Sequence, residues 1–108
     1  MSEYLFIQSQ DPFTETRVSY QYELAMRLAS VGHDVKVLLI QNGVLPARAG
    51  VRCSEIIKLV ESPVTVIADK FSLEQREIAH NQLHHNIDVG DEGIVIDAML
   101  AKQKVIWN

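Results

Sequence analysis

Cys53 is the only cysteine in this 108-residue sequence, and it is the first side chain to consider for nucleophilic or sulfur chemistry. It follows Arg52 and precedes Ser54, where a helix is predicted to begin. A helix N-terminus and a neighbouring guanidinium both lower the pKa of a thiol, so this position is compatible with a reactive thiolate. Free cysteine is also among the most buried residue types and usually packs as a small hydrophobic side chain. The sequence favours this structural role.

His80 and His84 have a spacing that, on a helix, would place both imidazoles on one face, where they could share a metal ion. Two imidazoles are fewer than the three or four protein ligands of a zinc site, so Asp88 would have to complete the set. A polar surface segment that also contains His85 accounts for the same pattern. Glycine-rich phosphate-binding and nucleophile-elbow motifs are absent from the sequence. We therefore predict no metal and no other cofactor.

Strands and helices that alternate along the chain must position these side chains. Short apolar runs bounded by turn residues predict strands over 4–8, 35–40, 64–68 and 104–107. Apolar spacing and helix-end signals predict helices from Thr14 or Thr16 to Gly32, over 54–62, from Ser72 onward and over 91–102. This alternation implies βαβ units. We predict one α/β domain, residues 1–108, that is a three-layer α/β/α sandwich with a mainly parallel sheet of about five strands.

Ligands of parallel sheets bind outside the carboxyl ends of the strands. Here those ends fall at Ser9–Pro12, Gln41–Val44 and Ala68–Phe71. Backbone N–H groups at Gly43 could face a ligand, and Asp11 and Asp69 could converge as a carboxylate pair for acid–base chemistry. Turn and cap roles account for the same residues equally well. The candidate ligand-binding residues are Ser9, Asp11, Asn42, Gly43, Asp69, Lys70 and Phe71.

Charge and composition exclude several classes of partner. The net charge is −4 and no Lys/Arg cluster is present, whereas nucleic-acid binding needs a basic face, so we predict no nucleic-acid partner. No stretch long enough to span a membrane is free of charges, and no signal peptide begins the chain, so we expect no membrane association. A single thiol fits a reducing compartment, and the cytoplasm is the predicted location.

Several stretches together resemble the DsrE/DsrF/DsrH group of small sulfur-relay proteins, which includes TusB, TusC and TusD. The segment VLLIQNGVLPA (37–47) is similar to the strand and Q-[DN]-G-V turn of that group. IIKLVESPVTVIADKFSLEQREI (56–78) is similar to the DsrH/TusB pattern of short helix, Pro-bounded strand, polar loop and Arg-containing turn. Residues 91–108 resemble the last helix and terminal strand, and residues 8–37 resemble the first helix of DsrE-like members.

The resemblance implies a parallel three-layer fold, assembly into homo-oligomers or hetero-hexamers, and, in members that accept persulfide sulfur, a reactive cysteine just after the third strand. This chain has Ala68 and Asp69 at the nearest positions, and Cys53 lies in the preceding connection. We therefore expect a non-catalytic subunit or binding module of intracellular sulfur relay that forms a homo-oligomer and docks other sulfur-relay proteins. Two alternatives are a persulfide carrier that uses Cys53 and a small-ligand-binding protein with a pocket at the strand ends, formed at a subunit interface.

Overall fold

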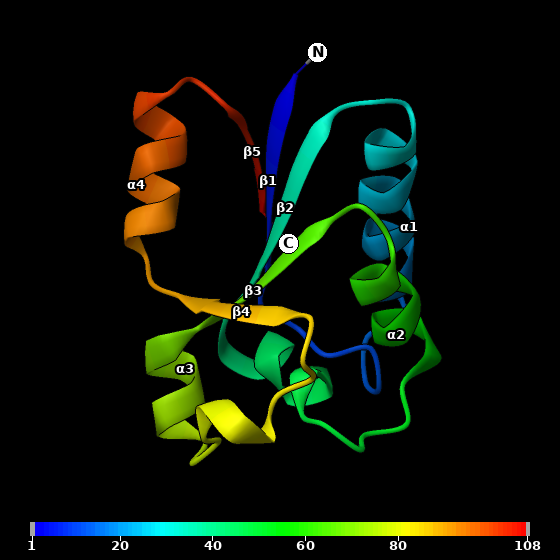
Figure 1. Cartoon of the computed structure of the whole chain (residues 1–108), viewed down its shortest axis with the longest axis vertical. Coiled ribbons are helices and arrows are strands. Elements are labelled where there is room, and N and C mark those ends of the chain that lie inside the picture. The colour runs from blue at the N-terminus through cyan, green and yellow to red at the C-terminus, as the bar shows by residue number, and fades with distance from the viewer. Residues whose placement is uncertain (1, 108) are drawn as a thin grey trace.

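Five short strands form one wholly parallel sheet in the computed structural model, which describes residues 2–107 (Figure 1). The strands are β1 (Glu3–Gln8), β2 (Asp34–Leu39), β3 (Thr65–Asp69), β4 (Ile87–Gly90) and β5 (Lys104–Trp107). Their order across the sheet is β4-β3-β2-β1-β5, so β5 returns to the far side of β1 after the chain has moved steadily toward β4. The predicted fold class and strand number are confirmed.

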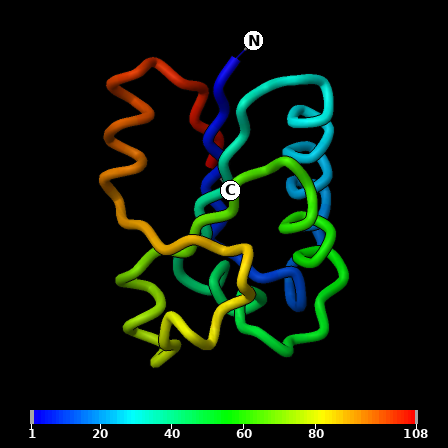
Figure 2. The backbone as a smooth tube through the Cα atoms, viewed as in Figure 1, coloured from blue at the N-terminus to red at the C-terminus, as the bar shows by residue number. Residues whose placement is uncertain are grey.

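Helices cover both faces of the sheet and complete three layers (Figure 1). Helices α1 (Arg17–Ser30) and α2 (Ser54–Glu61) lie on one face, and α4 (Gly93–Leu100) lies on the other. The short helix α3 (Lys70–Gln75) and the 3-10 segments η1 (Gln41–Ala47) and η2 (His80–Gln82) gather beyond the carboxyl ends of the strands, as the backbone trace shows (Figure 2). None of the helices within residues 2–107 has the length and apolar character needed to cross a membrane.

Strand pleating divides the core into two clusters, one on each face of the sheet. In β1, Phe6 points into the larger cluster under α1 and α2, whereas Leu5 and Ile7 point into the smaller cluster under α4. Because both faces of the strands are buried, their sequences are continuous apolar runs rather than alternating ones. Helix α1 contributes a buried stripe at three- and four-residue spacing, which consists of Val18, Tyr22, Ala25 and Ala29.

The structure differs from the sequence prediction at three places. Strand β4 was not among the predicted strands because it is a four-residue edge strand in which Asp88 faces solvent. The helix predicted from Ser72 begins at Lys70, because the Asp69 side chain caps it by accepting the Ser72 N–H. The segment after β2, which the sequence analysis treats only as a strand end, forms a 3-10 helix from Gln41 to Ala47.

Removing residues 104–108 should destabilise the fold, because β5 pairs with β1 and packs the half-buried Val105 and Ile106 against the core. Half-burial of two aliphatic side chains contributes about 2–3 kcal/mol. A loss of that size lowers the melting temperature of a domain this small by roughly 10 °C or more. Thermal unfolding followed by circular dichroism measures the shift, and an unchanged melting temperature would contradict the pairing of β5 with β1.

Candidate functional site

A cavity of about 220 Å³ lies at the carboxyl ends of the strands, on the α4 face of the sheet. Side chains at or just beyond the ends of β1, β2, β3 and β5 form its floor, and α3 and α4 form its walls. This is the position where open α/β sheets bind ligands. The residues that line it are Ile7, Leu38, Ile40, Gln41, Asp69, Phe71, Ser72, Gln75, Glu92, Val95 and Trp107.

A hydrogen-bonded relay through Ser72 organises the polar side of this cavity. The Ser72 hydroxyl donates to Asp69 Oδ2 at 2.7 Å, and the Ser72 N–H donates to the same oxygen at 3.0 Å. The hydroxyl in turn accepts the Gln41 N–H at 2.8 Å. Asp69 and Ser72 are both buried, so these polar groups need their partners. The relay ties the end of β3 and the first turn of α3 to the segment that follows β2.

Asn42 and Gly43 do not line the cavity; they connect η1 to α3 and to β1. Asn42 Oδ1 accepts a hydrogen bond from Arg76 at 3.0 Å, which gives α3 and η1 a second connection. The Gly43 N–H donates to the Ile40 carbonyl at 2.8 Å and so is already engaged within the protein. A Cβ atom at Gly43 would lie 2.2 Å from the carbonyl oxygen of Gln8, so only glycine fits this close approach of η1 to β1.

The Asp11 side chain forms hydrogen bonds within its own loop. Its Oδ1 accepts the N–H groups of Phe13 and Thr14, at 2.9 and 3.0 Å. Asp11 does not line the cavity, so the structure does not bring it together with Asp69. Ser9 and Lys70 also lie outside the cavity lining. Of the predicted ligand-binding residues, only Asp69 and Phe71 face the cavity.

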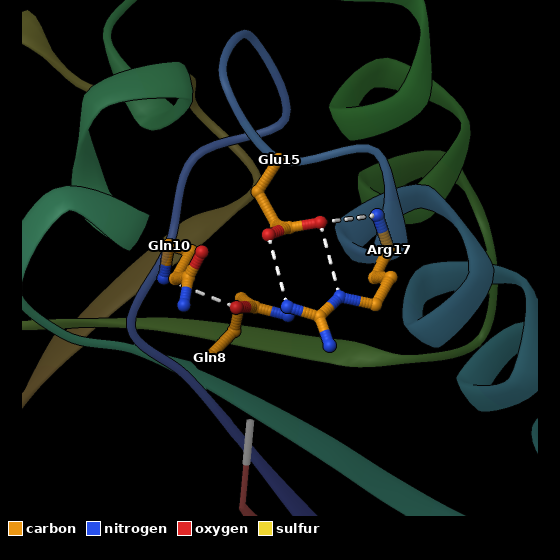
Figure 3. Close-up of polar contacts among 4 residues, drawn as sticks. All are labelled: Gln8, Gln10, Glu15 and Arg17. Carbon is orange, nitrogen blue, oxygen red and sulfur yellow. Dashed lines mark hydrogen bonds and ion pairs between the residues drawn. The ribbon is translucent and has the colours of Figure 1, made fainter.

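The loop after β1 contains a polar cluster that the sequence did not single out (Figure 3). Gln8, fully buried at the end of β1, donates to the Gln21 side chain, and its Oε1 accepts the Gln10 N–H at 3.1 Å. Nearby, Arg17 pairs with both oxygens of Glu15, at 3.1 Å each, and these hydrogen bonds lower the pKa of the Glu15 carboxyl. Gln8 belongs to a face of β1 opposite to that of Ile7, so this cluster is separate from the cavity.

Cys53 is buried on the opposite face of the sheet from the cavity, in the cluster under α1 and α2. Its Sγ donates to the Glu55 carboxylate at 3.2 Å. Burial raises the pKa of the Cys53 thiol; the backbone of Ile56 opposes this rise, and the Glu55 carboxylate adds to it. Arg52 makes no ion pair within residues 2–107 that would offset the Glu55 charge. The local setting therefore favours the neutral thiol over the thiolate.

His80 and His84 do not share a helix face, because η2 ends at Gln82 and His84 follows it. The His84 ring stacks on the His85 ring with their centroids 4.6 Å apart. Within the described residues, no group of three or more His, Cys, Asp and Glu side chains is placed to hold a metal ion.

Sequence reasoning missed most of the cavity residues because they come from segments far apart in the chain. Glu92 and Val95 reach it from the start of α4, and Trp107 reaches it from the end of β5. No local pattern marks these positions, since their proximity depends on how α4 packs on the sheet. Ser72 did carry a signal, because the sequence identified it as a helix-start residue, and it lies in the first turn of α3, where its hydroxyl also accepts the Gln41 N–H.

Solved structures share the fold of this chain over its full length or nearly so. The crystal structure of the ychN protein from E. coli matches with a TM-score of 0.87 and 16% sequence identity, covering 100% of both chains. MTH1491 from Methanobacterium thermoautotrophicum, a protein of unknown function, matches equally completely with a TM-score of 0.86 and 17% identity. The chain has the DsrE/DsrF-like fold.

A third structure, the conserved protein of unknown function BT1422 from Bacteroides thetaiotaomicron, has a TM-score of 0.73 and 20% identity, and the match covers 97% of this chain and 94% of that chain. No protein-family model and no curated protein matches the sequence. At these identities the structural matches establish the fold, while the function has to be argued from the site.

Replacing Gly43 by Ala should destabilise the protein by about 1–3 kcal/mol, because the new methyl group would overlap the Gln8 carbonyl and force η1 away from β1. Gly93→Ala is a matched control: its Cβ would meet the flexible Asp91 side chain at 2.9 Å, and alanine favours the helix that begins there. Urea unfolding midpoints compare the two variants. Equal stability of both would show that η1 does not require glycine at position 43.

Alkylation of Cys53 in the folded protein should be slow. At mildly alkaline pH we expect iodoacetamide to react at least about tenfold more slowly than with the urea-unfolded chain, because the thiol is buried and its pKa is raised. Intact-protein mass spectrometry over time gives both rates, and Cys53→Ser verifies that the adduct is on this residue. Equal rates in the folded and unfolded states would mean that the thiol is accessible.

Proposed function

We propose that this chain is a non-catalytic binding module with a DsrE-like fold, which holds a small neutral or cationic group at the carboxyl ends of its strands. The observation that carries the proposal is the separation of the thiol from the cavity. The family resemblance implies a reactive cysteine just after the third strand, and there this chain has Ala68, Asp69 and the Ser72 relay. The chemistry at the strand ends is therefore hydrogen bonding and charge.

The charge of the lining selects the class of ligand. Asp69 and Glu92 contribute carboxylates, and no Lys, Arg or His side chain lines the cavity. Ser72 occupies one oxygen of Asp69, and the remaining negative charge repels anions and attracts cations. Ile7, Leu38, Ile40, Phe71, Val95 and Trp107 supply the apolar surface. An apolar group that carries a hydroxyl or an ammonium suits this combination.

We further propose that the protein assembles with copies of itself through α4 and β5. Helix α4 exposes Ile96, Met99 and Leu100, and Trp107 is exposed at the end of β5. Strand β5 is an edge strand, which leaves one row of its backbone hydrogen-bonding groups unpaired in the sheet. An apolar helix face beside an open edge suits a self-complementary two-fold contact. Because Trp107 also lines the cavity, a second copy in this position would cover its opening.

The alternative of a persulfide carrier that uses Cys53 would require the thiol to become exposed and ionised. Its burial and its hydrogen bond to Glu55 favour the opposite state. A place in intracellular sulfur relay, with the cytoplasm as its location, is proposed on the family resemblance, and the partner would be a protein that brings its own reactive cysteine.

Three matched probes test the ligand class: benzylammonium, benzyl alcohol and benzoate, which share a ring and differ in charge. In ¹H–¹⁵N NMR titrations at constant ionic strength, we expect the cation and the neutral alcohol to shift the amides of Gln41, Phe71 and Val95, and benzoate to bind at least about fivefold more weakly. Glu92→Gln should reduce the difference between cation and anion. Tighter binding of benzoate than of benzylammonium would contradict the proposed ligand class.

Sedimentation equilibrium tests the proposed assembly. We expect the wild type to be a dimer or larger at micromolar concentration, and the double variant Ile96→Glu/Leu100→Glu to be a monomer, because two charges on one helix face would be buried at the contact. Leu24→Glu, which changes an exposed apolar residue on α1, is the control and should assemble as the wild type does. A monomeric wild type, or loss of assembly in the control variant, would rule out the α4 and β5 contact.

A further inference from the structure

A second hollow, of about 490 Å³, lies between the segment that joins η1 to α2 and the turn that joins α3 to η2. We call it the arginine hollow, because two of the five arginines of the chain line it. It does not share residues with the cavity at the strand ends. Its lining consists of Arg48, Ala49, Gly50, Val51, Arg76, Glu77, Ile78 and Gln82.

Both guanidinium groups in this hollow are held in place by neutral acceptors. Arg48 Nε donates to the Leu45 carbonyl at 2.9 Å. Arg76 donates to the Ser72 carbonyl at 3.2 Å and to Asn42 Oδ1 at 3.0 Å. Each guanidinium has five N–H groups, so several remain available on both arginines.

Neither arginine forms an ion pair with a carboxylate of the described residues. The only ion pair among residues 2–107 joins Arg17 to Glu15, on another part of the surface. Glu77 is the one carboxylate in the lining of the hollow, so two guanidiniums against one carboxylate leave an excess of one positive charge. In a chain with a net charge of −4, this local excess is opposite in sign to the whole molecule. An anion would be drawn to it.

The walls of the hollow are joined by backbone hydrogen bonds. Ala49 donates to the Gln82 carbonyl at 2.6 Å, and His84 donates to the Ala47 carbonyl at 2.9 Å. Gly50, in the same lining, is exposed and adopts φ +84°, and no atom lies within 4 Å of where its Cβ would be, so no side chain obstructs the hollow there. A site that is formed before its ligand arrives loses less entropy on binding.

We propose that the arginine hollow binds a phosphate group, as inorganic phosphate or as a phosphate monoester, between the guanidinium groups of Arg48 and Arg76. Planar guanidinium groups donate paired hydrogen bonds to phosphate oxygens, which a point charge does not reproduce. The carboxylate of Glu77 opposes binding and therefore limits affinity. The proposal is independent of the ligand class assigned to the cavity at the strand ends.

Titration of the full chain with sodium phosphate, at ionic strength held constant with sodium chloride, tests this site by ¹H–¹⁵N NMR. We expect saturable shifts of the amides of residues 49–51 and 77–78. Arg48→Gln should weaken binding by about fivefold or more, because it removes charge-assisted hydrogen bonds. Glu77→Gln should tighten binding, because it removes the opposing charge. Arg76→Lys keeps the charge, and we expect weaker binding from loss of the paired donors.

Arg52→Gln is the matched control, since it removes an exposed positive charge close in sequence but outside the hollow. Binding by this variant should equal that of the wild type. Weakening equal to that of Arg48→Gln, or an absence of saturable shifts, would overturn the proposal. A parallel titration with methyl phosphate distinguishes the two sources: tighter binding than inorganic phosphate assigns the site to an ester, and weaker binding assigns it to the free ion.

Discussion

The region at the strand ends depends on the hydrogen bonds of the Ser72 hydroxyl. This hydroxyl donates to the Asp69 carboxylate and accepts the Gln41 N–H, so a single side chain joins the end of β3, the start of α3 and the segment after β2. Buried polar groups are costly unless they are paired, and this relay pairs three of them at once. One consequence is the position of α3 beside α4, which creates the cavity. Another is that one oxygen of Asp69 is used for capping, which removes the simplest basis for acid–base chemistry.

The sheet separates two kinds of site. On the α1 and α2 face, Cys53 lies beside Glu55 and near Tyr22, whose buried hydroxyl has no hydrogen-bond partner within the described residues and whose pKa is raised, chiefly by burial. This environment favours neutral groups. On the α4 face, the acidic cavity lies among the strand ends and contains no thiol. The hydrogen-bonded sheet lies between the two faces, so a reaction that needed both the thiol and the cavity would have to cross the core.

Much of the fold could be predicted from local pattern. Val35, Val37 and Leu39 lie in a short apolar run that is typical of a strand covered on both faces, and the spacing of Val18, Tyr22 and Ala25 within α1 predicts its buried side. Strand β4 escaped prediction because an edge strand needs little apolar sequence. The cavity escaped for a different reason. Its lining includes Glu92 and Trp107, whose approach to Asp69 is a property of the tertiary packing, and the short α3 is specified by one capping carboxylate instead of by periodicity.

We propose that the protein binds ligands at the ends of its strands and does not carry sulfur on Cys53. The most direct test is intact-protein mass spectrometry of the native protein after incubation with a persulfide donor, beside Cys53→Ser and beside a protein known to accept sulfur from the same donor. We predict that incubation leaves the masses of the wild type and of Cys53→Ser unchanged, with no sulfur atom added to either protein. Gain of a sulfur atom by the wild type alone would contradict the claim and make Cys53 the functional thiol.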